Sequence, residues 1–189
     1  MNAVTKADLA VLDFIQDHIC VGFLDSFMMA VTSLGNGGIL WIALAAVLLI
    51  FKKSRKYGLM MALALILGAL ICNVTLKPLV ARIRPYELAE SVKLLISAPA
   101  DYSFPSGHTT ASFAAASSLF ISGAKGRYAV LLLAVLIAFS RLYLYVHYPT
   151  DVLGGMIFGI LAGFVGYLIV KFLEAKLSGR KNAGNQIRR

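Results

Sequence analysis

Long apolar stretches dominate this chain of 189 residues and limit the folds that it can adopt. Hydrophobic residues make up 59% of the sequence and charged residues only 14%, whereas a soluble domain carries about a quarter charged residues. A helix needs about 20 apolar residues to cross a hydrocarbon core of about 30 Å. Six segments approach this length, at 21–34, 37–51, 57–76, 109–122, 128–145 and 152–172. The sequence therefore predicts an all-α integral membrane protein, a bundle of about six transmembrane helices.

Both ends of the chain are predicted to lie outside these spans. In residues 1–20, apolar side chains recur at helical spacing between polar ones, which is typical of an amphipathic helix at the membrane interface. Residues 178–189 are basic and are predicted to form a cytoplasmic tail. Nothing between them resembles a linker, so residues 1–189 are predicted to form a single membrane-embedded domain.

The positive charge of the chain, formally +9, indicates topology rather than a nucleic-acid partner. Most of the Lys and Arg residues lie at segment ends or in the tail, as in the cytoplasmic loops of plasma-membrane proteins. With short connections between antiparallel neighbours, both termini are predicted to be cytoplasmic. The loops at 35–38, 77–108 and 146–151 are then predicted to face outside.

Three polar clusters interrupt the apolar sequence, at 77–85, 105–108 and 140–151. Each cluster falls on the predicted outer side of the membrane, although the topology was argued without them. A cation at a helix end is usually only an interfacial anchor. Several cations and two histidines on one outer face run against the positive-inside trend, however, and favour a single functional site.

The clusters contain the groups needed to bind a phosphate. Lys77 and Arg84 are seven residues apart, so on a helical stretch they would point the same way. Arg141 can bind two phosphate oxygens at once. Ser106 and Gly107 open an apolar segment, where free backbone N–H groups favour an anion.

Two histidines and a carboxylate can supply the chemistry. His147 precedes Asp151 by four residues, so Asp151 can accept a hydrogen bond from one imidazole nitrogen while the other attacks phosphorus. His108 can then protonate the leaving oxygen. The sequence has no cluster of carboxylates for a two-metal site, so we expect neither a metal nor another cofactor.

The pattern Lys-x6-Arg-Pro, Pro-Ser-Gly-His and Ser-Arg-x5-His-x3-Asp resembles the type 2 phosphatidic acid phosphatase superfamily, which includes vanadium haloperoxidases and glucose-6-phosphatase. The resemblance spans residues 77–151 and implies that His147 forms a phosphohistidine, oriented by Asp151, with His108 as the general acid. It also implies a set of phosphate-binding residues: Lys77, Arg84, Ser106, Gly107 and Arg141.

A site at the outer boundary of a small bundle predicts a lipid phosphate or diphosphate that arrives by lateral diffusion. Undecaprenyl diphosphate, phosphatidylglycerophosphate and phosphatidate are the candidate substrates, and the loop at 86–104 is expected to select among them. Some carrier-specific relatives have Asp where this chain has Gly107. The Pro-Ser-Gly-His motif of this chain therefore resembles that of the broad lipid phosphatases more closely.

Two other classes of protein could use such a set of residues, a vanadium haloperoxidase and a non-catalytic lipid-phosphate binding or transport protein. A vanadium haloperoxidase is disfavoured because those relatives are typically large soluble proteins. A non-catalytic lipid-phosphate binding or transport protein is also disfavoured, because it would need no nucleophile, whereas this chain has His147, His108 and Asp151. The sequence leaves open the oligomeric state, the role of Asp25, and whether the glycines of the last span pack within the bundle or between protomers.

Overall fold

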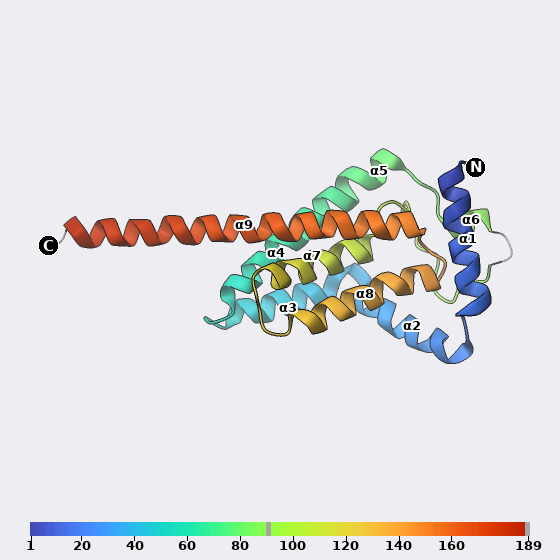
Figure 1. Ribbon diagram of the computed structural model, residues 1–189, viewed down its shortest axis with the longest axis horizontal. Coiled ribbons are helices and arrows are strands. Elements are labelled where there is room, and N and C mark those ends of the chain that lie inside the picture. The colour runs from blue at the N-terminus through green and yellow to red at the C-terminus, as the bar shows by residue number, and fades with distance from the viewer. Residues whose placement is uncertain (90–91, 188–189) are drawn as a thin grey trace.

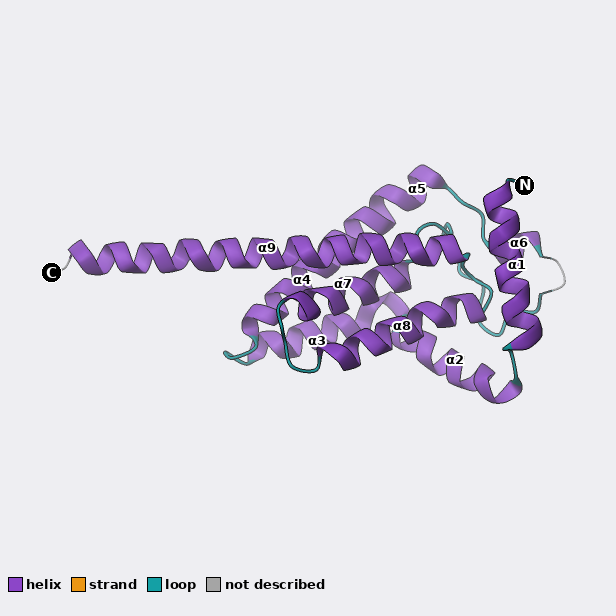
Figure 2. Cartoon of the chain, in the orientation of Figure 1, coloured by secondary structure: helices purple, strands orange, loops and turns teal. Residues whose placement is uncertain are grey.

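The computed structural model describes residues 1–89 and 92–187, and helices make up its regular structure, with no strand among these residues (Figures 1 and 2). The longer helices are α1 (Ala3–His18), α2 (Gly22–Leu34), α3 (Ile39–Ile50), α4 (Arg55–Ala69), α7 (Gly107–Ile121), α8 (Arg127–Tyr143) and α9 (Pro149–Ile187). The short elements are a 3-10 turn η1 (Asn36–Gly38), a π-helical segment η2 (Leu70–Leu76), α5 (Lys77–Val80) and α6 (Pro85–Leu88).

The predicted count of six spans is not confirmed. By length and composition, the run Arg55–Leu88 and the run Pro149–Ser178 can each cross a membrane, and the bent pair of α2 and α3 can form a third span. Helices α7 and α8, with 15 and 17 residues, are shorter than the ~20 residues of a typical span. The described residues therefore do not support six transmembrane helices.

The connection at 35–38 is not the antiparallel turn that its length predicted. Helices α2 and α3 form a pair bent by 41°. Gly37 and Gly38 adopt left-handed φ values of 58° and 67°, which bend the chain without reversing it. The 13 and 12 residues of α2 and α3 give lengths of about 20 and 18 Å, each too short for a hydrocarbon core of about 30 Å. The pair therefore makes one pass along the bundle.

The termini lie at opposite ends of the bundle (Figure 1). Helix α1 lies across the end reached by α5, α6 and the start of α9, whereas α9 extends away from it toward the C-terminus. The structure does not confirm that both termini share one side of the membrane, because α2 and α3 make one pass along the bundle instead of two. The basic connections at 51–54 and 122–126 lie at the end opposite α1.

The two terminal segments are both helical. Helix α1 falls within the predicted range 1–20 and buries Asp8, Leu12 and Ile15; its position at a membrane interface stays a prediction. The basic tail predicted from residue 178 continues helix α9 as far as Ile187.

Helix α7 forms the centre of the bundle and packs against α4, α8 and α9. Its buried residues between Thr109 and Leu119 are mainly Ala, Ser and Thr, which let neighbouring helices approach closely. A Cβ at Gly159 would lie 2.6 Å from the Thr110 carbonyl oxygen, and one at Gly166 would lie 2.8 Å from the Met60 carbonyl oxygen. These glycines of α9 therefore pack within the bundle, against α7 and α4.

This close packing predicts that Gly159→Ala destabilises the protein. The added methyl group would overlap the α7 backbone, and overpacking of this kind costs about 1–3 kcal/mol. Gly22→Ala is the matched control, because a Cβ there meets nothing within 4 Å. We expect thermal unfolding in detergent to give a lower Tm for Gly159→Ala alone, and equal Tm values for the two variants would contradict this packing.

Candidate active site

A cavity of about 670 Å³ lies at the end of the bundle that carries the polar clusters. Six of the eight predicted site residues line it: Lys77, Arg84, Gly107, His108, Arg141 and His147. The other two, Ser106 and Asp151, are fully buried and do not line it. The structure therefore gathers residues from the three sequence clusters around one cavity.

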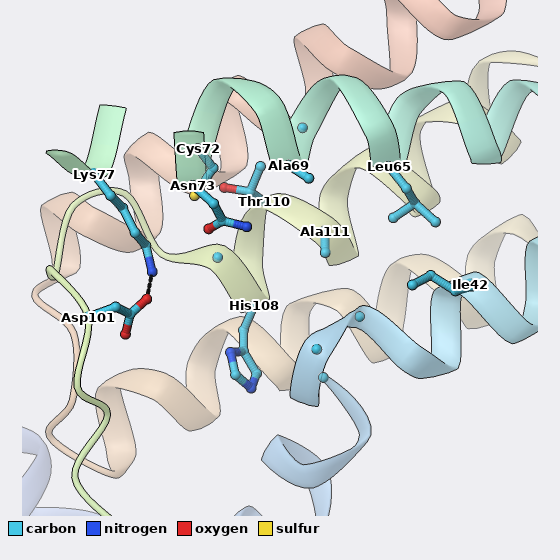
Figure 3. A pocket seen from close by; sticks show the side chains of 15 residues that line it. Ile42, Leu65, Ala69, Cys72, Asn73, Lys77, Asp101, His108, Thr110 and Ala111 are labelled. Carbon is cyan, nitrogen blue, oxygen red and sulfur yellow. Dashed lines mark hydrogen bonds and ion pairs between the residues drawn. The ribbon is translucent and has the colours of Figure 1, made fainter. Parts of the chain in front are cut away.

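An adjoining hollow of about 300 Å³ extends from this cavity between α3, α4 and α7. Figure 3 shows Lys77 and Asp101 at one edge of it and His108 at another, with Ile42 and Leu65 at its far end. The lining of the hollow thus changes from charged to apolar with distance from the polar centre.

The two predicted phosphate-binding cations of the first cluster come from separate elements. Lys77 follows the π-helical segment η2 and begins α5, which ends after Val80 because Ala81 adopts a left-handed φ of 46°. Arg84 comes from the extended residue before Pro85 of α6. The predicted continuous helical stretch is therefore wrong, although both side chains line the cavity.

Asp101 binds both of these cations, and the sequence analysis did not assign it to the site. Its Oδ2 accepts from Lys77 Nζ and its Oδ1 accepts from Arg84 Nη2 at 2.6 Å. The Asp101 side chain is 54% exposed, whereas those of Lys77 and Arg84 are 9% and 2% exposed. Burial alone would raise the pKa of Asp101, but the two ion pairs outweigh it and lower the pKa to about 2. A carboxylate therefore lies between two predicted phosphate-binding groups.

Arg141 reaches the cavity from α8 with part of its hydrogen-bonding capacity unused. Its Nη1 donates to Thr32 Oγ1 at 2.5 Å, and its buried Nε has no hydrogen-bond partner among the described residues. Within the same part of the chain it forms no ion pair. A buried guanidinium in this state favours an anionic ligand.

His147 lies in the turn between α8 and α9 and is 1% exposed. Its Nδ1 is 3.4 Å from Asp151 Oδ2, and its Nε2 is 3.2 Å from Arg84 Nη1. Burial lowers the pKa of His147 to about 3, since the raising effect of Asp151 is smaller and Arg84 lowers it further. The imidazole is therefore neutral near pH 7, and the tautomer with a proton on Nδ1 leaves the Nε2 lone pair directed toward Arg84.

The second cluster forms the start of α7. Ser106 is its N-cap residue and accepts a hydrogen bond at Oγ from the Thr109 amide at 3.4 Å. A Cβ at Gly107 would lie 3.8 Å from Lys77 Nζ, so the glycine leaves space beside that cation. His108 Nε2 is 3.0 Å from Asn36 Oδ1 in the η1 turn, the segment that was predicted to be an outer loop.

Residues outside the predicted set complete the surroundings of Asp151. Its Oδ1 accepts from Arg82 Nη1 at 2.6 Å, and its Oδ2 accepts from Ser103 Oγ at 2.5 Å. Arg82 also pairs with Asp8 of α1. The first polar cluster already contained Arg82, but no local pattern pointed to Ser103 or Asp8. Among the described residues, no group of three His, Cys, Asp or Glu is placed to hold a metal ion.

Comparison with known proteins agrees with this geometry. The PAP2 superfamily profile matches residues 53–174. The chain is 31% identical over 150 residues to the undecaprenyl-diphosphatase of Sulfolobus acidocaldarius, covering 79% of this chain and 72% of the relative. It is 32% identical over 189 residues to phosphatidylglycerophosphatase B of Bacillus subtilis, covering 93% of this chain and 87% of the relative. The crystal structure of Aquifex aeolicus LpxE superposes with a TM-score of 0.72 at 32% identity, covering 84% of this chain and 93% of that one.

The position of Asp101 predicts that it competes with phosphate-like anions. Asp101→Asn would remove the charge that occupies Lys77 and Arg84, so we expect orthovanadate to bind roughly three- to tenfold more tightly, in line with the ~1 kcal/mol of a half-exposed ion pair. Asp17→Asn, at an exposed position on α1, is a control for the loss of one negative charge. Weaker binding by Asp101→Asn would instead mean that Asp101 holds the cations in place.

The low pKa of His147 predicts a pH-dependent stability. The unfolded state takes up a proton as pH falls through about 6.5, whereas folded His147 stays neutral until about pH 3, so the free energy of unfolding decreases as pH falls from 7 to 5. The limit is about 1.4 kcal/mol per pH unit for one group. His147→Gln cannot titrate, so we expect its Tm to fall less over this interval than that of the wild type. If the Tm values of the wild type and His147→Gln fell equally between pH 7 and pH 5, folded His147 would not be held neutral.

Proposed function

The chain belongs to the PAP2 superfamily and is a membrane lipid phosphatase, and we propose that it works without a metal ion through a phosphohistidine on His147. The observation that carries this proposal is the double contact of His147. Its Nδ1 faces the Asp151 carboxylate and its Nε2 faces the Arg84 guanidinium inside the cavity. One nitrogen is oriented by a carboxylate, and the other lies where a bound phosphate would meet a cation.

In the first step the substrate phosphate replaces Asp101 on Lys77 and Arg84 and reaches Arg141. Burial and the neighbouring cations lower the pKa of His108 to about 3, and the bound phosphate anion offsets these cations, so His108 takes up a proton from water when the substrate binds. The lone pair on His147 Nε2 attacks phosphorus, the bond from phosphorus to the leaving oxygen breaks, and protonated His108 gives its proton to that oxygen. The cations stabilise the charge on the three equatorial oxygens as the phosphoryl group is transferred. Asp151 stabilises the positive charge that develops on the imidazole.

In the second step water hydrolyses the phosphohistidine. The neutral His108 left by the first step takes a proton from the water, whose oxygen attacks phosphorus as the bond to Nε2 breaks. Inorganic phosphate leaves, and both histidines return to their starting protonation states. The three cations that bind substrate in the first step act again in the second.

We propose a phosphate- or diphosphate-bearing lipid as the substrate. The apolar part of the adjoining hollow, with Ile42 and Leu65, suits a hydrocarbon chain next to the polar centre. Undecaprenyl diphosphate, phosphatidylglycerophosphate and phosphatidate are the candidates, and the first two correspond to the named activities of two relatives. Leu95 and Ile96 of the long loop line the cavity, where we expect this loop to contribute to selection.

We propose that the reaction takes place at the outer face of the plasma membrane. The basic connections lie at the bundle end opposite the cavity, and such loops are retained in the cytoplasm. In this orientation α1 lies on the outer side and the end of α9 in the cytoplasm. Residues 1–189 act as one domain, because α1 contacts both α8 and α9 beside the cavity.

The test is phosphate release in detergent with EDTA from each of the three candidate lipids. We expect wild-type release in EDTA and a loss of roughly 1,000-fold or more in His147→Ala, because the nucleophile is removed. His18→Ala, an exposed histidine on α1, is the matched control and should act as the wild type does. The rank order of the lipids identifies the substrate class.

Three results would contradict the proposal. Loss of wild-type release in EDTA would mean that a metal ion takes part. Retained release by His147→Ala would place the nucleophile elsewhere. Lipid binding or transfer without any phosphate release would favour a transport protein.

A further inference from the structure

Arg82 connects two buried carboxylates that come from opposite parts of the chain. Its Nη2 is 2.8 Å from Oδ2 of Asp8 in α1, and its Nη1 is 2.6 Å from Oδ1 of Asp151 in α9. The three side chains are 18%, 4% and 0% exposed. The guanidinium also lies 3.8 Å from the ring centre of Tyr148, so its plane is held from a third direction.

Asp8 also holds the first turn of α9. It accepts hydrogen bonds from the backbone amide of Thr150 at 3.1 Å and from Thr150 Oγ1 at 2.5 Å. Amides in the first turn of a helix have no partner within that helix, so a carboxylate there stabilises both the amides and the helix dipole. The residue after Thr150 is Asp151, and α1 therefore holds the backbone that carries the predicted orienting carboxylate.

The two oxygens of Asp151 have separate partners. Oδ1 faces Arg82, while Oδ2 accepts from the Tyr148 amide at 3.0 Å and faces His147 Nδ1 at 3.4 Å. Rotation of the carboxylate would exchange these partners, and the contact of Oδ1 with Arg82 opposes that rotation. A continuous set of contacts thus runs from Asp8 through Arg82 and Asp151 to His147.

We propose that Asp8 is a positioning residue for the phosphatase reaction: through Arg82 and the first turn of α9, it holds the Asp151 carboxylate in the orientation that directs His147 Nε2 at phosphorus. The inference rests on the proposed role of His147. It gives one residue of the N-terminal helix a positioning role, whereas the sequence predicted only an interfacial helix. Asp8 acts through other residues and makes no contact with the cavity.

The experiment compares Asp8→Asn with Asp17→Asn, an exposed aspartate on the same helix, using release of phosphate from dioctanoyl phosphatidate in detergent with EDTA. We expect kcat of Asp8→Asn to fall roughly 10- to 100-fold, as is common when an outer partner of a catalytic group is removed. KM should change less than twofold, because the phosphate-binding cations are untouched. Asp17→Asn should keep the kcat and KM of the wild type.

A double variant separates positioning from general loss of stability. Asp8 acts through Asp151 in this proposal, so adding Asp8→Asn to Asp151→Asn should lower kcat by less than threefold further. A full additional 10-fold loss would overturn the proposal and make Asp8 an independent structural clamp. Equal kcat in Asp8→Asn and the wild type would also overturn it.

If Asp8→Asn does not fold, Arg82→Lys tests the proposed positioning role of Asp8. A single ammonium keeps the positive charge but cannot bridge both carboxylates as the guanidinium fork does, so the same loss of kcat with unchanged KM is expected. Wild-type kcat in Arg82→Lys would then overturn the proposal. His147→Ala, assayed in parallel, keeps the two proposals apart. If it retains activity, the proposed function fails; if it is inactive while Asp8→Asn is unaffected, only the positioning role fails.

Discussion

Burial of like charges at one end of an apolar bundle is the constraint on which the architecture of this protein depends. The cations are Lys77, Arg82, Arg84 and Arg141, and the carboxylates that lie among them are Asp8, Asp101 and Asp151. An unpaired buried ion costs several kcal/mol, and carboxylates that share the space offset this cost for Lys77, Arg82 and Arg84. In the described residues Arg141 forms no ion pair, and Asp101 is the most exposed of the carboxylates that pair with these cations. An entering phosphate can therefore meet one unpaired cation and two that an exposed carboxylate can release.

The sequence predicted the centre of the site better than its frame. Spacing and residue type predicted that His147, Asp151 and the cavity-lining cations lie together, as they do in the structure, while their catalytic and binding roles stay predictions. The expected reversal at 35–38 was wrong because the left-handed backbone of Gly37 and Gly38 bends the chain there without turning it back, and the count of six spans is therefore not confirmed. Asp8 escaped prediction because its partner Arg82 is 74 residues away, and no local pattern records such a pairing.

The long connection between α6 and α7 illustrates the same limit. The sequence predicted a loop there, and in the structure Leu94 and Ile96 pack on the cluster that includes Tyr143 and Val146. Tyr86 Oη donates to the Pro99 carbonyl at 2.7 Å, which holds the two ends of the loop together. Asp101 follows two residues later, so the position of the competing carboxylate depends on this packing. The loop residues proposed to select the substrate and the carboxylate that pairs with Lys77 and Arg84 therefore belong to one segment.

Close helix packing, which is usually a matter of stability, also sets the geometry of the polar centre. A Cβ at Gly155 would lie 2.8 Å from the Ser106 carbonyl oxygen, so only glycine lets the start of α9 approach the start of α7 this closely. At this separation the Ser106 amide donates to the Asp151 carbonyl at 3.1 Å, a backbone contact between the second and third polar clusters. His108 lies two residues beyond Ser106, and His147 lies four residues before Asp151. The distance between the proposed acid and the proposed nucleophile therefore depends on a glycine in an apolar helix, which takes no part in the chemistry.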